Sequence, residues 1–68
     1  MKTIGNILYE KRKAKHLTQD KLGEMIGVSG RSIGDWECGK CYPNALALCG
    51  LTDVFECSVD ELLGRKSV

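Results

Sequence analysis

Residues 18–37 read "TQDKLGEMIGVSGRSIGDWE", and this stretch carries two apolar stripes with a glycine between them. Apolar residues that recur three and four positions apart lie on one face of a helix. The stripes consist of Leu22, Met25, Ile26, Ile33 and Trp36. The stretch therefore predicts two short amphipathic helices, at about 18–26 and 29–37, with almost no chain between them.

The junction of these two helices contains only Gly27 and Val28, so the chain must turn sharply there. Gly27 can adopt the positive φ that commonly ends a helix. Gly23, on the inner side of the first of the two helices, leaves room for the next helix to cross closely. Two short helices held at a steep angle by a tight glycine turn form a helix-turn-helix unit, which we place at about 18–37.

Capping residues mark the starts of the helices. At four places a capping residue follows a nonpolar residue, and another apolar residue comes four positions after the cap, which is the pattern of an N-cap with a hydrophobic staple. These caps are Thr18, Ser29, Asn44 and Ser58, and the last also forms a capping box with Glu61. With the apolar residues near the N-terminus, the pattern predicts an all-α fold, a compact five-helix domain over residues 1–68. The expected helices span about 3–14, 18–26, 29–37, 44–55 and 58–63.

Length and composition agree with one small folded domain. The chain has 68 residues, of which 43% are hydrophobic and 28% charged. A core of this size contributes only ~3–5 kcal/mol of net stability. No run approaches the roughly 20 apolar residues of a membrane span, and no leader resembles a signal peptide. We therefore expect a cytoplasmic protein with no membrane partner, whose four cysteines stay reduced.

Charge is distributed unevenly along the chain, although the net charge is only +1. Residues 1–42 have a balance of +3 and residues 43–68 a balance of −2. A chain polarised in this way can present a basic face to a partner and an acidic back to solvent. A mixed, solvated surface would give the same numbers, so charge alone does not separate the two interpretations.

The stretches "RKAKHLTQDKLGEMIGVSGRSIGDWECGKCYP" and "SVDELL" resemble the Cro and phage-repressor family of helix-turn-helix domains. The resemblance extends from about Ile4 to Leu63. It implies a lambda-repressor-like fold and sequence-specific binding of double-stranded DNA by a transcriptional regulator, which we expect to be a repressor. It also implies a homodimer on a two-fold operator. We expect no enzymatic activity, cofactor, metal or small-molecule ligand.

The resemblance assigns roles to individual residues, with the helix at 29–37 placed in the major groove. Arg31 would donate to guanine, and Asp35 would accept from a cytosine amino group. Gln19 and Lys40 would contact phosphates. The full set of expected DNA-binding residues is Thr18, Gln19, Ser29, Gly30, Arg31, Ser32, Asp35 and Lys40.

Two further features follow from the same resemblance. Arg12 and Glu37 match a salt bridge that joins the first helix to the third in this family. Gly30 and Gly34 depart from the family pattern, because they place no side chain on the outward face of the third helix. Either these glycines let the backbone lie close to DNA, or they have drifted at positions without contacts. Gly34 should also weaken that helix by about 1 kcal/mol relative to alanine.

Two other functions remain open from the sequence. One is a protein-interaction module, such as an antitoxin whose main partner is a toxin. The other is a metal- or thiol-sensing regulator that uses the C-x-x-C pair Cys38 and Cys41. A structural zinc site needs four ligands, and we expect Cys49 and Cys57 to lie in the core as small hydrophobic residues. We therefore predict that the pair holds no metal.

Overall fold

The computed structural model describes residues 3–64, and the part of the chain it describes is entirely helical between its turns. Within residues 3–64 five helices follow one another: α1 (Ile4–Ala14), α2 (Gln19–Ile26), α3 (Gly30–Cys38), α4 (Ala45–Phe55) and α5 (Val59–Leu62). The all-α, five-helix prediction is therefore confirmed, and the ends agree to within one residue. Within the described range no helix is long and apolar enough to cross a membrane.

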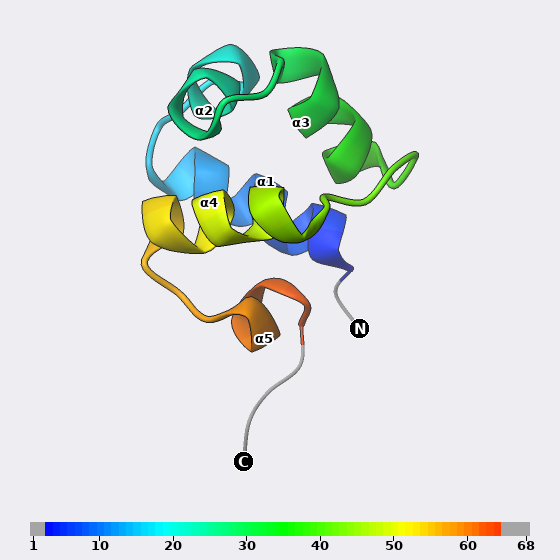
Figure 1. Ribbon diagram of the computed structural model, residues 1–68, viewed down its shortest axis with the longest axis vertical. Coiled ribbons are helices and arrows are strands. Elements are labelled where there is room, and N and C mark those ends of the chain that lie inside the picture. Colours follow the sequence, from blue (N-terminus) through cyan, green and yellow to red (C-terminus); the bar gives the residue numbers. More distant parts are fainter. Residues whose placement is uncertain (1–2, 65–68) are drawn as a thin grey trace.

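The helices are arranged with α2 and α3 together at one end of the molecule and α5 at the other, while α1 and α4 lie between them (Figure 1). α2 packs against α3 and α4, and α1 packs against α3 and α5. The helix-turn-helix unit is therefore supported from behind by α1 and α4. Its outer side faces away from the acidic C-terminal part of the chain.

Every helix begins with a side chain that accepts a hydrogen bond from a free backbone N–H. The four predicted caps are confirmed, and the Asn44 side chain, for example, accepts from the backbone of Ala47 at 2.8 Å. Thr3 caps α1 in the same way. The predicted capping box at Ser58 forms only in part. The backbone N–H of Glu61 donates to Ser58, but the Glu61 carboxylate instead accepts a hydrogen bond from Lys11 of α1.

The turn between α2 and α3 has the geometry that its glycines predict. Gly27 has a φ of 83°, in the left-handed region, and the N–H of Val28 donates to the carbonyl of Gly23 at 2.8 Å. A Cβ atom on Gly23 would lie 2.5 Å from the carbonyl oxygen of Val28. Glycine is therefore required at 23 for close approach and favoured at 27 for its backbone conformation.

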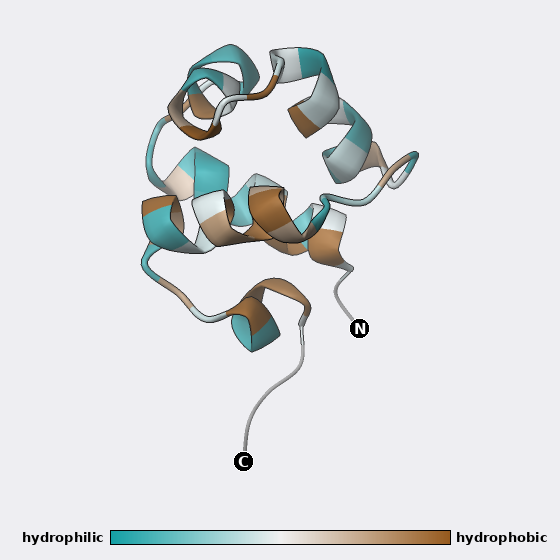
Figure 2. Cartoon of the chain, in the orientation of Figure 1, coloured by the Kyte–Doolittle hydropathy of each residue, from teal (hydrophilic) through white to brown (hydrophobic). Residues whose placement is uncertain are grey.

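The buried core joins all five helices. Its fully buried side chains are Leu8, Leu22, Ile33, Leu51 and Leu62. The prediction that Cys49 lies in the core was wrong, because the buried face of α4 consists of Ala47, Leu51 and Phe55, while Cys49 is exposed. Cys57 is half-buried and packs against the core, and this burial raises the pKa of its thiol. Figure 2 shows hydrophobic residues at several positions around α4, so its apolar residues do not mark a single face.

Candidate nucleic-acid interface

α3 presents Arg31 at the second position of the helix, and its side chain is exposed. Among residues 3–64 the Arg31 guanidinium has no hydrogen-bond or ion-pair partner. Asp35, one turn further along, is half-buried. The first turn of α3 therefore carries a free guanidinium with five donors, the group best suited to bidentate recognition of a base or a phosphate.

Two of the serines expected to contact DNA are already engaged at the start of α3. Ser29 is the N-cap, and its hydroxyl accepts from the backbone N–H of Ser32 at 3.2 Å. The hydroxyl groups of Ser29 and Ser32 also lie 3.2 Å apart and share a hydrogen bond. Each hydroxyl keeps an acceptor site for an outside donor, but neither side chain is free to rotate without loss of this contact.

Lys40 lies just beyond α3, in a loop that folds back on the last turn of the helix. Gly39 ends α3 with a φ of 85°, and the backbone N–H of Lys40 donates to the carbonyl of Asp35 at 2.9 Å. The Lys40 side chain is exposed. The backbone at this position is therefore fixed, while the ammonium group can reach a partner that lies alongside α3.

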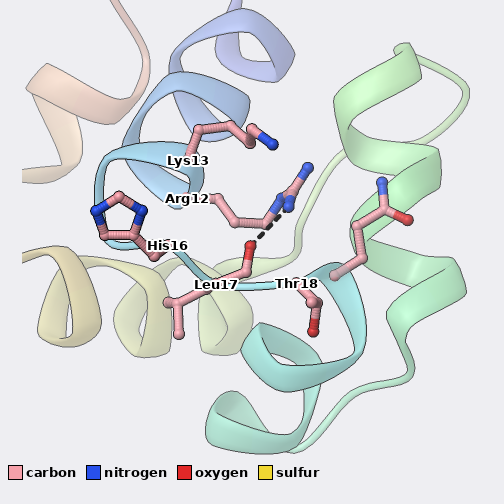
Figure 3. A pocket seen from close by; sticks show the side chains of 6 residues that line it. Arg12, Lys13, His16, Leu17 and Thr18 are labelled. Atoms are coloured by element: carbon pink, nitrogen blue, oxygen red, sulfur yellow. Dashed lines mark hydrogen bonds between the residues drawn. The ribbon is translucent and has the colours of Figure 1, made fainter.

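An open hollow of about 530 Å³ lies at the start of α2. It is lined by Arg12, Lys13, His16, Leu17, Thr18 and Gln19 (Figure 3). Thr18 caps α2 by accepting from the backbone of Lys21 at 3.0 Å. Basic side chains beside a helix N-terminus create a positive potential that suits an anion such as a phosphate. The structure thus brings Thr18 and Gln19 together with Lys13, a basic residue not included among the expected contacts.

Arg12 and Glu37 form the interhelical ion pair expected from the sequence. Nε of Arg12 lies 2.6 Å from Oε2 of Glu37, and the two side chains are only 9% and 7% exposed. A second guanidinium nitrogen donates to the carbonyl of Leu17 at 2.7 Å, the contact drawn in Figure 3. The hydrogen bond to Glu37 raises the pKa of Arg12 above its ordinary value. The pair is buried, and it ties α1 to the end of α3.

Gln19 belongs to the same network, which the sequence did not reveal. Its amide nitrogen donates to Oε1 of Glu37 at 3.1 Å, so the Glu37 carboxylate accepts from both α1 and α2. Gln19 is half-buried as a result. Its side chain was expected to be available to a phosphate, but one of its amide donors is committed to holding α2 against α3.

Both sequence-based explanations of the α3 glycines assumed that their missing side chains would point away from the protein, and the structure corrects this. A Cβ atom on Gly30 would lie 1.9 Å from Oδ1 of Asp20. A Cβ atom on Gly34 would lie 3.4 Å from the amide of Gln19. Both positions face the first turn of α2. The absence of a side chain at 30 therefore has a packing reason.

The basic residues in and directly after α1 do not form one patch; they are Lys11, Arg12, Lys13 and Lys15. Lys11 donates a hydrogen bond to Glu61 of α5, which raises the pKa of the lysine. Lys15 lies 4.0 Å from Glu56, at the end of α4. These two lysines are therefore directed toward the acidic C-terminal part. Lys13, by contrast, lines the hollow at the start of α2.

The cysteines are four free thiols, and Cys38 and Cys41 are both exposed at the end of α3. Within residues 3–64 no group of three or more His, Cys, Asp or Glu residues is placed to hold a metal ion. A tetrahedral zinc site within one chain would need two further ligands beside this pair. The described part of the structure offers none.

Comparison with known proteins places this geometry in a family. A family model described as Helix-turn-helix matches residues 8–62. The chain is 43% identical over 61 residues to the HTH-type transcriptional activator BcrR of Enterococcus faecalis. That match covers 90% of this chain and 30% of the activator. The chain is also 37% identical over 60 residues to repressor protein C2 of Salmonella phage P22. That match covers 88% of this chain and 28% of the repressor.

A third relative is the cryptic phage CTXphi transcriptional repressor RstR of Vibrio cholerae, which is 38% identical over 58 residues. That match covers 85% of this chain and 52% of RstR. The chain therefore spans between 28% and 52% of the length of these relatives.

Solved structures show the same relationship. The crystal structure of the P22 c2 repressor in complex with a synthetic operator has a TM-score of 0.92 and 33% identity, and the match covers 97% of this chain and 100% of that one. A transcriptional regulator from Listeria innocua has a TM-score of 0.88 at 24% identity, which shows the fold alone. The five helices thus form a lambda-repressor-like fold, and the chain belongs to the helix-turn-helix family of Cro and phage-repressor type.

Proposed function

We propose that this chain is a sequence-specific, double-stranded DNA-binding transcriptional regulator that acts in the cytoplasm and reads the major groove with α3. The observation that carries the proposal is the exposed Arg31, which stands without a partner among residues 3–64 on the first turn of α3. In helix-turn-helix proteins this turn contacts base edges. The likeness to a repressor solved on its operator supports the same orientation.

The surroundings of α3 suit the two phosphate backbones that border a major groove. The hollow at the start of α2 offers Lys13 and His16 beside Thr18 on one side, and the loop after α3 offers Lys40. Phosphate contacts of this kind fix the register of a protein on the duplex, and base contacts then supply the specificity. Gln19, Ser29, Ser32 and Asp35 complete the proposed surface.

The regulatory effect that we propose is repression. A small domain that occupies an operator blocks other proteins from the same DNA, and no catalytic group is needed for that effect. Two of the relatives above are described as repressors and one as an activator. These descriptions favour a DNA-binding role over the antitoxin alternative, because none of them concerns a toxin.

The proposal is tested by titrating duplex DNA with the protein at several salt concentrations, with fluorescence anisotropy as the readout. A DNA-binding protein releases counterions from the phosphates, so its affinity falls steeply as salt rises. A module that binds only another protein would show no salt-dependent affinity for duplex DNA at micromolar concentrations, and that result would contradict the proposal.

Replacing Lys40 with alanine should weaken binding to all sequences alike, because an ammonium group on a phosphate carries no base information. The slope of log affinity against log salt should become shallower by about one unit. Lys11→Ala is the matched control, since Lys11 pairs with Glu61 and lies away from the proposed surface. A loss of affinity confined to one sequence would show that Lys40 reads a base instead.

A homodimer on a two-fold operator is part of the same proposal. Leu46, on the first turn of α4, is 82% exposed, and Tyr42, four residues earlier, is 75% exposed. Two large apolar side chains this close in the chain offer a small surface that a second copy could cover.

Leu46→Asp should therefore reduce cooperative binding of two copies to a duplex that contains both half-sites, while binding to a single half-site stays near wild type. The charge would be buried against the partner copy. Met25 is a half-exposed apolar residue of α2, and Met25→Asp serves as the control for the general effect of a surface charge. Equal cooperativity of the Leu46 variant and the wild type would remove this residue from the dimer contact.

A further inference from the structure

One side chain of α2 occupies the space that a glycine of α3 leaves empty, and a second lies beside another glycine of that helix. The Asp20 carboxylate lies where a side chain of Gly30 would begin, with Oδ1 at 1.9 Å and the Asp20 Cα at 3.0 Å from the position of a Cβ atom. The Gln19 amide lies 3.4 Å from the corresponding position on Gly34. The outer face of the helix-turn-helix unit is therefore built from α3 and from the first turn of α2 together.

Asp20 is well placed to face a ligand of α3. It is exposed, and within residues 3–64 its carboxylate has no hydrogen-bond or ion-pair partner. It lies against Gly30, the first residue of α3, and the partial positive charge of a helix N-terminus favours a carboxylate there. Arg31 follows directly in the chain. An acceptor from α2 and a donor from α3 thus stand at the same end of the proposed reading helix.

Gln19 differs from Asp20 because its side-chain amide already makes a hydrogen bond inside the protein. Its amide nitrogen donates to Glu37, which fixes the orientation of the amide. Asp20 makes no such hydrogen bond within residues 3–64. If α3 lies in a major groove, Asp20 is therefore an unengaged acceptor that stands directly beside the first residue of that helix.

We propose that Asp20 is a specificity-determining residue, which accepts a hydrogen bond from a cytosine amino group next to the base pair read by Arg31. Asp is an acceptor only, and the exposed N4 amino group of cytosine is the donor that a carboxylate recognises in the major groove. This inference rests on the proposed DNA-binding function. It assigns base recognition to a residue of α2, outside the helix that carries Arg31.

The competing explanation is that Asp20 only stabilises the start of α3 and repels phosphates. The two explanations differ in what they predict for base preference. Loss of a repelling charge raises the affinity for every sequence equally and makes the salt dependence steeper. Loss of a base contact instead lowers the discrimination at one base pair and leaves the other positions unchanged.

The experiment measures affinities of the wild-type protein and its variants for the duplex it prefers and for every single base-pair change of that duplex. Asp20→Ala should reduce the discrimination at one C·G pair by about tenfold, which is within the range for a single base contact. Asp20→Asn keeps the shape of the side chain, and it should shift the preference at that pair toward adenine, which an amide recognises through N6 and N7. Glu24 is an exposed acidic residue of the same helix, and Glu24→Gln is the control for the loss of a charge alone.

Each outcome decides the inference. A changed preference at one position in both Asp20 variants, with none in Glu24→Gln, supports it. An unchanged preference in Asp20→Asn, with a uniform rise in affinity, overturns it and leaves Asp20 with the structural role. A wild-type protein with no sequence preference at all would contradict the proposed function itself, so the two failures can be told apart.

Discussion

Replacing Glu37 with alanine is expected to leave a large fraction of the protein unfolded at room temperature. The change strands the Arg12 guanidinium, whose side chain is only 9% exposed, without its carboxylate. It also removes the acceptor of the Gln19 amide. Breaking a buried pair from one side costs ~3–5 kcal/mol. A domain of this size has a total stability of about 3–5 kcal/mol, so the loss consumes nearly all of it.

The measurement is thermal and urea unfolding followed by circular dichroism. Lys21→Ala is the matched control, because Lys21 and Glu24 form an exposed pair at 4.0 Å, whose contribution is at most about 1 kcal/mol. The double replacement Arg12→Met with Glu37→Leu should recover much of the stability, since it leaves no charge uncompensated. A Glu37→Ala protein that melts with the wild type would show that the ion pair contributes nothing to stability.

Arg31→Ala is expected to weaken binding to the preferred duplex by ~1–3 kcal/mol and to relax the preference for one G·C pair. The reason is that the guanidinium can donate two parallel hydrogen bonds to O6 and N7 of guanine, and alanine can donate none. The free energy of unfolding should barely change, because Arg31 is exposed and has no partner among the described residues.

Arg31→Lys separates charge from geometry in this prediction. Lysine keeps the positive charge but loses the planar fork that makes the bidentate contact. The salt dependence of Arg31→Lys should therefore stay near wild type while its discrimination falls. If Arg31→Ala kept the full base preference, the reading role would belong to another residue of the surface.

The elements of the fold were predictable because their signals are local. A cap at Thr18 or Ser29 acts on the backbone N–H groups of the next turn, and the positive φ of Gly27 depends on its own lack of a Cβ atom. Such features do not depend on where the other helices lie. For this reason the starts of all four later helices agree with the sequence.

The buried face of α4 was not predictable in the same way. Residues 45–51 are almost all apolar or small, so every face of this helix offers a hydrophobic stripe. The packing of α2 and α5 against α4 decides that Leu51 is buried and Cys49 is exposed. Periodicity cannot choose between faces that look alike.

In the candidate site, too, some features could be predicted from the sequence and others depend on how the helices pack. The resemblance to a family predicted the Arg12–Glu37 pair, which the structure contains, while the DNA contacts of Arg31 and Lys40 stay predictions. The contact of Gln19 with Glu37 and the closeness of Asp20 to Gly30 depend on how α2 crosses α3. That crossing is a tertiary property, and no spacing within either helix encodes it.

Selection of bound sites from random duplex DNA by the wild-type protein shows whether this chain reads a base sequence. We expect the enriched sequences to share a short two-fold repeat, with a G·C pair in each half-site and half-sites about one helical turn apart. We also expect that Arg31→Ala, selected in parallel, loses the enrichment of that G·C pair while the rest of the motif persists. A wild-type protein that enriches no sequence above the starting pool would contradict the claim that this chain reads DNA.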